Sequence, residues 1–164
     1  MDDQVAMDIV GVRIELPTNT PILLLRERNG KRFLPIWIGP NEAAAIALAL
    51  QGIEPERPMT HDLLKVVAEQ LGAEVDRVVV TELREGTFFA DLVMRQGDEI
   101  VAVSTRPSDA IALATRTRSP VFASRAVLDE GGVEIHDDSQ EEEIERFREF
   151  LDDITAEDFE SGSA

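Results

Sequence analysis

The stretch Ile22-Leu-Leu-Leu-Arg-Glu-Arg-Asn-Gly-Lys-Arg-Phe-Leu-Pro-Ile-Trp-Ile38 carries two apolar runs on either side of Asn29-Gly30. The runs Ile22 to Glu27 and Arg32 to Ile38 have the length and the aliphatic and aromatic content of β-strands. Asn-Gly between two such runs predicts a two-residue hairpin turn, because both central positions of that turn need positive φ. The stretch therefore predicts a pair of antiparallel strands.

A third strand is predicted before this hairpin, over Val5 to Leu16. Apolar residues alternate with polar ones along this run, which is the period of a half-buried strand. The alternation changes phase beside Gly11, and such a change indicates a β-bulge. We therefore expect a three-stranded meander to open the domain.

The rest of the chain predicts helices between runs of strands. Alanine-rich runs predict helices over 43–51 and up to Thr117, and an amphipathic run predicts one over 60–71. The predicted caps at their starts are Asn41, Ser108 and Thr60. Further strands are predicted over 75–83, 87–94, 99–104 and 120–123. This order is typical of the α+β class, with a mainly antiparallel sheet of about seven strands and three core helices.

The composition changes near Asp129, and the chain is predicted to divide into a domain over 1–132 and an appendage over 133–164. Ser139 to Glu142 has the sequence of a capping box. Apolar residues follow at helical spacing on an otherwise acidic surface: Ile144, Phe147, Leu151 and Ile154. These features predict an acidic amphipathic C-terminal helix.

The net charge of −17 argues at first against a nucleic-acid ligand, whose phosphates the protein would repel. The charge is unevenly distributed. Up to Leu128 the chain has 18 acidic and 14 basic side chains, and beyond it 15 acidic and 2 basic ones. The first part has a net charge of only −4, which is compatible with transient binding of phosphate.

Composition also limits the chemistry. The chain has no cysteine and two histidines, so thiolate metal sites and cysteine nucleophiles are excluded, and any metal ion would be held mostly by oxygen. No phosphate-binding loop, GxSxG or HExxH motif is present. No apolar run is long enough to cross a bilayer, and Met1 to Gln4 lacks the basic start of a secretory signal. We expect a cytoplasmic protein.

Two Arg-Pro segments stand at predicted helix starts, Arg57 to Asp62 and Arg106 to Asp109, and the two could frame one cleft. His61 beside Asp62 suits a base or a metal site, although Thr60 and Asp62 also suit simple capping. An arginine at a helix start is electrostatically unfavourable. We therefore expect Arg106 to pair with Asp109 or Glu42, or to bind an anion.

Aromatic residues are few and do not alternate with basic ones as in proteins that stack nucleobases. Trp37 is predicted to lie in the core or to anchor an interface. Phe88 and Phe89 are adjacent on a predicted strand and must point to opposite faces of the sheet. We expect a partner subunit to cover one of these faces.

Several motifs, taken in order, resemble the bifunctional nuclease family. They are Leu34-Pro-Ile-Trp-Ile-Gly39, Glu42-Ala43 with Ala45-Ile46, Arg57-Pro-Met-Thr-His-Asp-Leu-Leu64, Leu71-Gly72-Ala73 and Arg106-Pro-Ser-Asp-Ala-Ile-Ala-Leu-Ala114. The resemblance extends from about Val5 to Gly132. It implies an α+β domain, usually oligomeric, with nuclease activity on DNA and RNA in some members and a prokaryotic cytoplasmic setting. Where the family usually has an aspartate two residues before the last motif, this chain has Ser104.

Two functional hypotheses follow. In the first, the protein is a nuclease in which oxygen ligands hold Mg²⁺ or Mn²⁺, a histidine acts as base or proton shuttle, and polar side chains hold phosphate. The metal ligands would be Glu42, Asp62 and Asp109, the catalytic residues His61, Asp62 and Asp109, and the substrate-binding residues Arg57, Arg106 and Ser108. In the second, the domain is a non-catalytic oligomeric module whose acidic C-terminal helix binds a basic protein partner.

Overall fold

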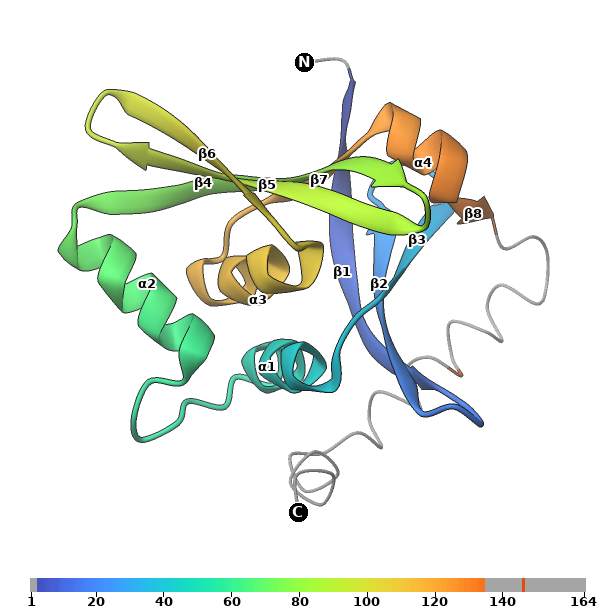
Figure 1. The fold of residues 1–164 in the computed structure, drawn as a ribbon, viewed down its shortest axis with the longest axis horizontal. Helices are drawn as coiled ribbons and strands as arrows, with labels where there is room; N and C mark the ends of the chain where they lie inside the picture. The colour runs from blue at the N-terminus through green and yellow to red at the C-terminus, as the bar shows by residue number, and fades with distance from the viewer. Residues whose placement is uncertain (1–2, 135–145, 147–164) are drawn as a thin grey trace.

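One eight-stranded sheet with four helices makes up the part of the chain that this computed structural model describes, residues 3–134 and 146 (Figure 1). The strands are β1 (Gln4–Glu15), β2 (Thr20–Glu27), β3 (Arg32–Trp37), β4 (Ala73–Arg84), β5 (Thr87–Gln96), β6 (Glu99–Thr105), β7 (Val121–Ser124) and β8 (Val133–Glu134). The helices are α1 (Pro40–Leu50), α2 (Thr60–Gln70), α3 (Pro107–Thr117) and α4 (Arg125–Gly131). The strand order across the sheet is β6-β5-β4-β7-β1-β2-β3-β8.

The predicted opening meander is present, since β2 pairs antiparallel with both β1 and β3. The register of β1 against β2 shifts between Ile9 and Gly11, which confirms the predicted bulge. The predicted hairpin turn is wrong in detail. Four residues, 28–31, join β2 to β3, and neither Asn29 nor Gly30 has positive φ. The longer loop removes the tight turn's need for a left-handed backbone.

A second meander, β4-β5-β6, forms the other half of the sheet. Here the two-residue turn with two left-handed positions does occur, at Glu85 and Gly86, whose φ angles are 51° and 79°. β7 joins the two halves by pairing parallel with β4 and antiparallel with β1. Figure 1 shows the two meanders running across each other, with α1, α2 and α3 grouped on one side of the sheet.

Small side chains bring α1 and α3 close to each other and to the sheet. Ala43, Ala45 and Ala47 of α1 are buried, and so are Ala110, Ala112 and Ala114 of α3. Both helices contribute to one apolar core with β1 to β4 and β7. The prediction that the helix after residue 42 is buried is therefore confirmed. α2 differs, since His61 is its one buried residue.

All three predicted caps are wrong by one or two positions. The residues before the first helical turns are Gly39, Met59 and Arg106. In α1 and α3 a proline takes the first helical position, where its fixed φ fits and its missing N–H is not needed. The caps therefore precede the prolines. This shift places the start of α3 directly at Arg106.

The structure confirms the α+β class with a mostly antiparallel sheet. Two short elements were not predicted, α4 and β8, and β8 extends the sheet past residue 132 by pairing with β3. The predicted acidic helix with Ile144, Phe147, Leu151 and Ile154 lies outside the described residues. Phe88 and Phe89 are both half-buried. Phe88 packs against the core, and Arg84 of the same chain lies 4.9 Å from the centre of the Phe89 ring, so contacts within the chain account for the partial burial of both rings.

Candidate active site

The starts of α1, α2 and α3 meet at a cluster of charged side chains. From the start of α3, the Arg106 guanidinium donates hydrogen bonds to Glu42 of α1 and to Asp109 of α3, each at 2.8 Å. The other Asp109 carboxylate oxygen lies 3.0 Å from Nε2 of His61 on α2. We call Glu42, Arg106, Asp109 and His61 the helix-start cluster. The sequence prediction that Arg106 pairs with Asp109 or Glu42 is confirmed for both.

Burial within the helix-start cluster is graded. The side chain of His61 is 9% exposed, those of Glu42 and Asp109 are 17% and 29% exposed, and that of Arg106 is 65% exposed. Because an ionised carboxylate only accepts hydrogen bonds, Nε2 of His61 is assigned as the donor to Asp109. The cluster therefore runs from a buried imidazole through a carboxylate to a solvent-accessible guanidinium.

The charges of this cluster do not cancel. Hydrogen bonds to Asp109 and Glu42 and the charges of these residues raise the pKa of Arg106 above its ordinary value, so this side chain stays cationic. One guanidinium faces two carboxylates, which leaves an excess of one negative charge before His61 is considered. Such a group can attract a cation, and its exposed guanidinium can turn toward a phosphate.

Asp62 belongs to a different contact. Its Oδ1 accepts a hydrogen bond from Nε of Arg116 at 2.6 Å, and its Oδ2 accepts one from the Met59 backbone N–H at 3.0 Å. Arg116 also donates to the carbonyl oxygens of Ala45 and Ala112, and its side chain is only 9% exposed. This network ties the start of α2 to the end of α3 and to α1.

The pKa of Asp62 results from opposing influences. Desolvation is the largest single one and raises the pKa, but the hydrogen bonds from Arg116 and Met59, with the charges of Arg116 and His61, lower it below its ordinary value overall. Asp62 is therefore held as a carboxylate by its contacts. This state suits a structural ion pair.

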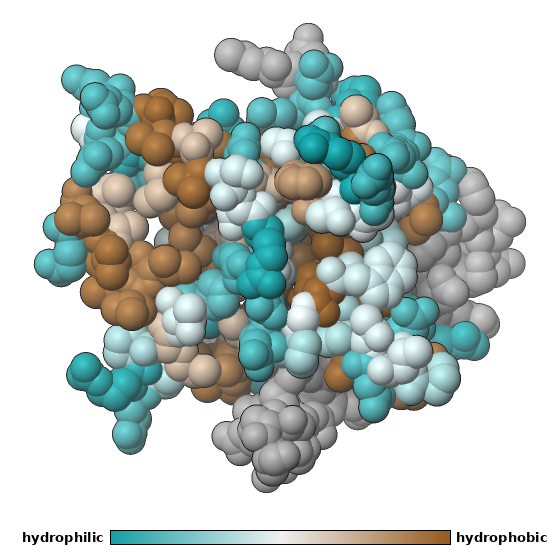
Figure 2. Space-filling view, viewed as in Figure 1, coloured by the Kyte–Doolittle hydropathy of each residue, from teal (hydrophilic) through white to brown (hydrophobic). Residues whose placement is uncertain are grey.

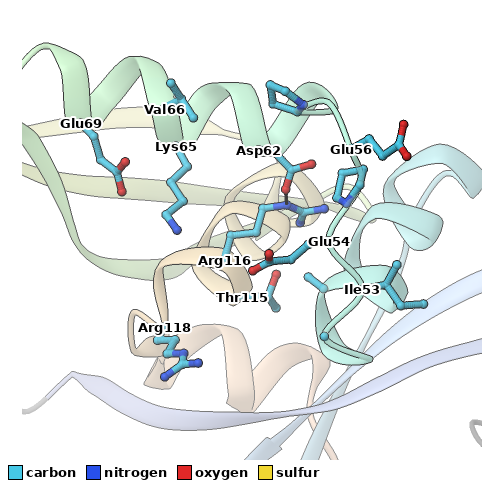
Figure 3. A pocket seen from close by; sticks show the side chains of 14 residues that line it. Ile53, Glu54, Glu56, Asp62, Lys65, Val66, Glu69, Thr115, Arg116 and Arg118 are labelled. Carbon is cyan, nitrogen blue, oxygen red and sulfur yellow. Dashed lines mark hydrogen bonds and ion pairs between the residues drawn. The ribbon is translucent and has the colours of Figure 1, made fainter.

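The Asp62–Arg116 pair lies in a pocket of about 430 Å³ between the 52–58 link, α2 and the end of α3. Figure 3 shows the Arg116 guanidinium directed at Asp62, and Lys65 extending from α2 on the side on which Arg116 lies. Acidic and basic side chains both line this pocket, among them Glu54, Glu69 and Arg118. The mixture gives it no clear preference for an anion or a cation.

The other predicted site residues are placed as follows. Ser108 is 5% exposed and lies at the start of α3, where it lines a second pocket together with Arg106. Arg57 is exposed, and no hydrogen bond or ion pair joins it to the helix-start cluster in the described part of the chain. Within residues 3–134 no three histidine, aspartate or glutamate side chains form a group that could hold a metal ion. Glu42 and Asp109 thus share Arg106 as a partner, while Asp62 pairs with Arg116.

Ser104, where the resemblance leads one to expect an aspartate, lies on the edge strand β6 opposite Asp91 of β5. It precedes Arg106 by two residues and is exposed. A carboxylate at this position would add negative charge across from Asp91, so Ser104 reduces the charge on this part of the edge.

Sequence reasoning missed Arg116, and it left two alternatives open for Trp37. Arg116 lies seven residues after Asp109 on α3, and that spacing places both on one helix face, so periodicity could have identified Arg116 as a partner for α2. Trp37 is 56% exposed, so the alternative that it lies in the core is wrong, while its role as an interface anchor stays a prediction. It lines the second pocket with Arg106.

Comparison with known proteins agrees with the resemblance seen in the sequence motifs. Residues 23–136 match the model of the bifunctional nuclease domain. An uncharacterized protein of Mycobacterium tuberculosis is 48% identical over 161 residues, which cover 93% of this chain and 96% of that protein. Bifunctional nuclease 1 of Oryza sativa subsp. japonica is 26% identical, over 70% of this chain and 35% of the plant protein. Bifunctional nuclease 2 of Arabidopsis thaliana is 28% identical, over 74% of this chain and 39% of that protein.

The chain belongs to the bifunctional nuclease domain family. It spans little more than a third of the plant nucleases that it matches. Among the described residues, no helix combines the length and apolar character that a membrane span requires.

Proposed function

We propose that this protein is a nuclease that hydrolyses phosphodiester bonds in DNA, RNA or both. The observation that carries the proposal is the helix-start cluster, in which three helix starts bring two carboxylates, a guanidinium and an imidazole into one hydrogen-bonded group. The plant relatives named as bifunctional nucleases support the same activity.

Arg106 is the residue that would contact the phosphate. Its guanidinium is the most exposed member of the cluster and offers paired donors, which match phosphate oxygens. His61 is nearly buried, so we assign it as a positioning residue that orients Asp109 rather than as a group that meets bulk water. Arg57 and Ser108 stay candidates for contacts with a longer substrate.

Glu42 and Asp109 are the proposed ligands of Mg²⁺ or Mn²⁺. Mg²⁺ is commonly held by one or two protein carboxylates together with substrate phosphates and water, so a third carboxylate is not required. The excess negative charge of the cluster fits a divalent cation. Such an ion would polarise the phosphodiester toward attack by water. Asp62 is left out of this proposed set because it pairs with Arg116 and the Met59 backbone, outside the helix-start cluster.

A cleavage assay tests the proposed nuclease activity. Purified protein should degrade labelled single-stranded DNA or RNA with added Mg²⁺ or Mn²⁺, and excess chelator should stop the reaction. Asp109→Asn should lower the rate about 100- to 1000-fold, as removal of one group that stabilises developing charge does. Equal degradation by the wild type and by Asp109→Asn would point to a contaminating nuclease and contradict the proposal.

We also propose that the protein assembles into a homo-oligomer. Assembly is expected whether the domain is a nuclease or a non-catalytic module. The supporting feature is an apolar face made by α2 and the edge strand β6. On α2 the exposed fraction is 46% for Leu64, 46% for Val67 and 67% for Leu71. On β6 it is 42% for Val101 and 45% for Val103, which lie opposite Met94 and Leu92 of β5 and so face the side of the sheet that the helices cover. Figure 2 shows hydrophobic surface gathered over α2 and the β5–β6 hairpin. Neighbouring exposed apolar side chains are costly to leave in water.

A second copy of the chain is the occupant that fits this face. Residues 135–164 begin after β8, which lies at the opposite edge of the sheet from β6. A twofold arrangement would cover the same apolar face on both copies and pair or shield the open edge of β6. A cytoplasmic location and a basic protein partner for the acidic segment are further proposals, and they rest on composition.

A further inference from the structure

We infer that the pocket beside Trp37 and Arg106 is a nucleobase subsite that accepts one unstacked base of a single-stranded nucleic acid. The inference rests on the proposed nuclease function for the kind of ligand. The pocket itself is a separate observation, since Arg106 is the one member of the helix-start cluster among the residues that line it.

Three chain segments that are distant in sequence form this pocket of about 330 Å³. They are the end of β3 with the following Gly39, the β4–β5 turn at Gly86, and the start of α3. Its size lies at the lower end of the roughly 300–1000 Å³ typical of small-molecule sites. A single base and its sugar are ligands of this size class, whereas a base pair within a duplex is not accessible to such a concave site.

Trp37 has the properties of a stacking residue. It is more than half exposed, although burial would be favourable for so large an apolar ring. Its indole Nε1–H donates to the carboxylate of Glu15 at 3.1 Å, so the ring is held in one orientation by the end of β1. An exposed aromatic ring with a fixed plane is what base stacking uses, and the contact does not depend on base identity.

Arg106 connects the pocket to the proposed reaction site. It lines the pocket with Trp37, and the same guanidinium bonds Glu42 and Asp109 of the helix-start cluster. A nucleotide whose base stacks on Trp37 would therefore place a phosphate beside Arg106. Phe88 supplies a second aromatic side chain to the lining, and Gly39 and Gly86 line the pocket without side chains.

The chain contains one tryptophan and no tyrosine, so its fluorescence reports on Trp37 alone. The test titrates the full chain, with Mg²⁺ present, with a short single-stranded DNA whose phosphorothioate backbone resists hydrolysis. Saturable quenching is expected with the single strand, and clearly weaker quenching with the duplex of the same sequence and with a strand that has the same backbone and no bases. Equal quenching by the strands with and without bases would overturn the inference, as would no quenching by the single strand.

Variants give a second readout, the affinity for a dye-labelled strand measured by anisotropy. Trp37→Ala should weaken binding about 5- to 150-fold, the range expected for loss of one base–aromatic stack. Trp37→Phe should restore most of the affinity because it keeps a ring. Ile100→Ala, which truncates a similarly exposed residue on the edge strand β6, should bind as the wild type. Wild-type affinity in Trp37→Ala would contradict a stacking role.

The binding and cleavage measurements separate the two proposals. Base-dependent quenching without any cleavage would support the subsite and count against the nuclease. Cleavage without quenching would support the nuclease and remove the subsite.

Discussion

Arg106 donates a hydrogen bond to Glu42 at 2.8 Å across 64 residues of sequence, and this contact joins the start of α3 to the start of α1. A cation at the start of a helix opposes the helix dipole, so Arg106 needs carboxylate partners to be favourable there. Two such partners bind it, yet its side chain is still 65% exposed. An ion pair this open contributes little to stability, which favours a functional reason for the arrangement.

The first prediction concerns Arg106→Gln. We expect cleavage to fall about 100- to 1000-fold, because a cationic donor to the phosphate is removed. The unfolding free energy should change by less than about 1 kcal/mol, since exposed ion pairs are weak. Steady-state cleavage and thermal unfolding provide the two measurements. Arg95→Gln is the matched control, because Arg95 also pairs with a carboxylate and is 53% exposed, but it lies on β5 and pairs with Asp76. Equal loss in both variants would argue against a specific role for Arg106.

The second prediction concerns Gly39, the residue before α1. Its backbone is ordinary, with φ −80° and ψ 158°, so alanine can adopt it, but a methyl group there would clash with Oε2 of Glu42. Gly39→Ala should therefore displace the Glu42 carboxylate and lower cleavage about 10- to 100-fold, since small misplacements of catalytic groups are costly.

A stability measurement shows whether Gly39→Ala loses activity without losing its fold. The melting temperature of Gly39→Ala should stay close to that of the wild type. Gly97→Ala is the contrasting variant, because an added methyl meets open space there while φ of +60° strains any side chain. It should lose about 1–2 kcal/mol of stability and keep its activity. Full activity in Gly39→Ala would remove Glu42 from the proposed site.

The sequence predicted most of the fold because its signals were local. Alternation, glycine turns and alanine-rich runs located seven strands and three helices to within a few residues. β8 is too short to carry a period, and it forms only by pairing with β3. The parallel pairing of β7 with β4 likewise depends on contacts across some 40 residues, which no local pattern encodes.

The candidate site was predicted less completely. Residue types at helix starts identified Glu42, His61, Arg106 and Asp109, which the structure brings together. Asp62 was grouped with them because it is adjacent to His61 in sequence. Successive residues on a helix point about 100° apart, so Asp62 faces Arg116 instead. Sequence adjacency alone could not distinguish these two directions.

The third prediction uses this ion pair. Asp62→Asn should lower the unfolding free energy by about 1–3 kcal/mol at neutral pH, because it leaves the nearly buried Arg116 without its charged partner. Cleavage should change by less than about threefold when it is measured well below the melting temperature. Asp8→Asn, which breaks an exposed pair with Arg28, is the control and should leave the melting temperature unchanged.

Acid should reduce the effect of Asp62→Asn. The folded pKa of Asp62 lies below its ordinary 3.8, so its contribution to stability is present above about pH 4 and is lost as the pH falls through the folded pKa. The stability difference between the wild type and Asp62→Asn should therefore shrink below about pH 3.8. Chemical denaturation across this range measures it. A difference that is independent of pH would mean that the carboxylate charge is not what stabilises the contact.

The fourth prediction concerns assembly. Leu64→Glu places a charge in the apolar face of α2, where Leu64 is 46% exposed in the single chain. If a second copy covers this face, each interface receives the charge twice because a twofold contact repeats every residue, and burying it unpaired costs several kcal/mol. Light scattering after size exclusion should then show a shift from oligomer to monomer. Leu16→Glu makes the same change at a residue that is 70% exposed on the β1–β2 turn, and it should keep the wild-type mass.

A wild-type chain that is monomeric throughout, or an oligomer that Leu64→Glu leaves intact, would show that α2 is not the contact between copies.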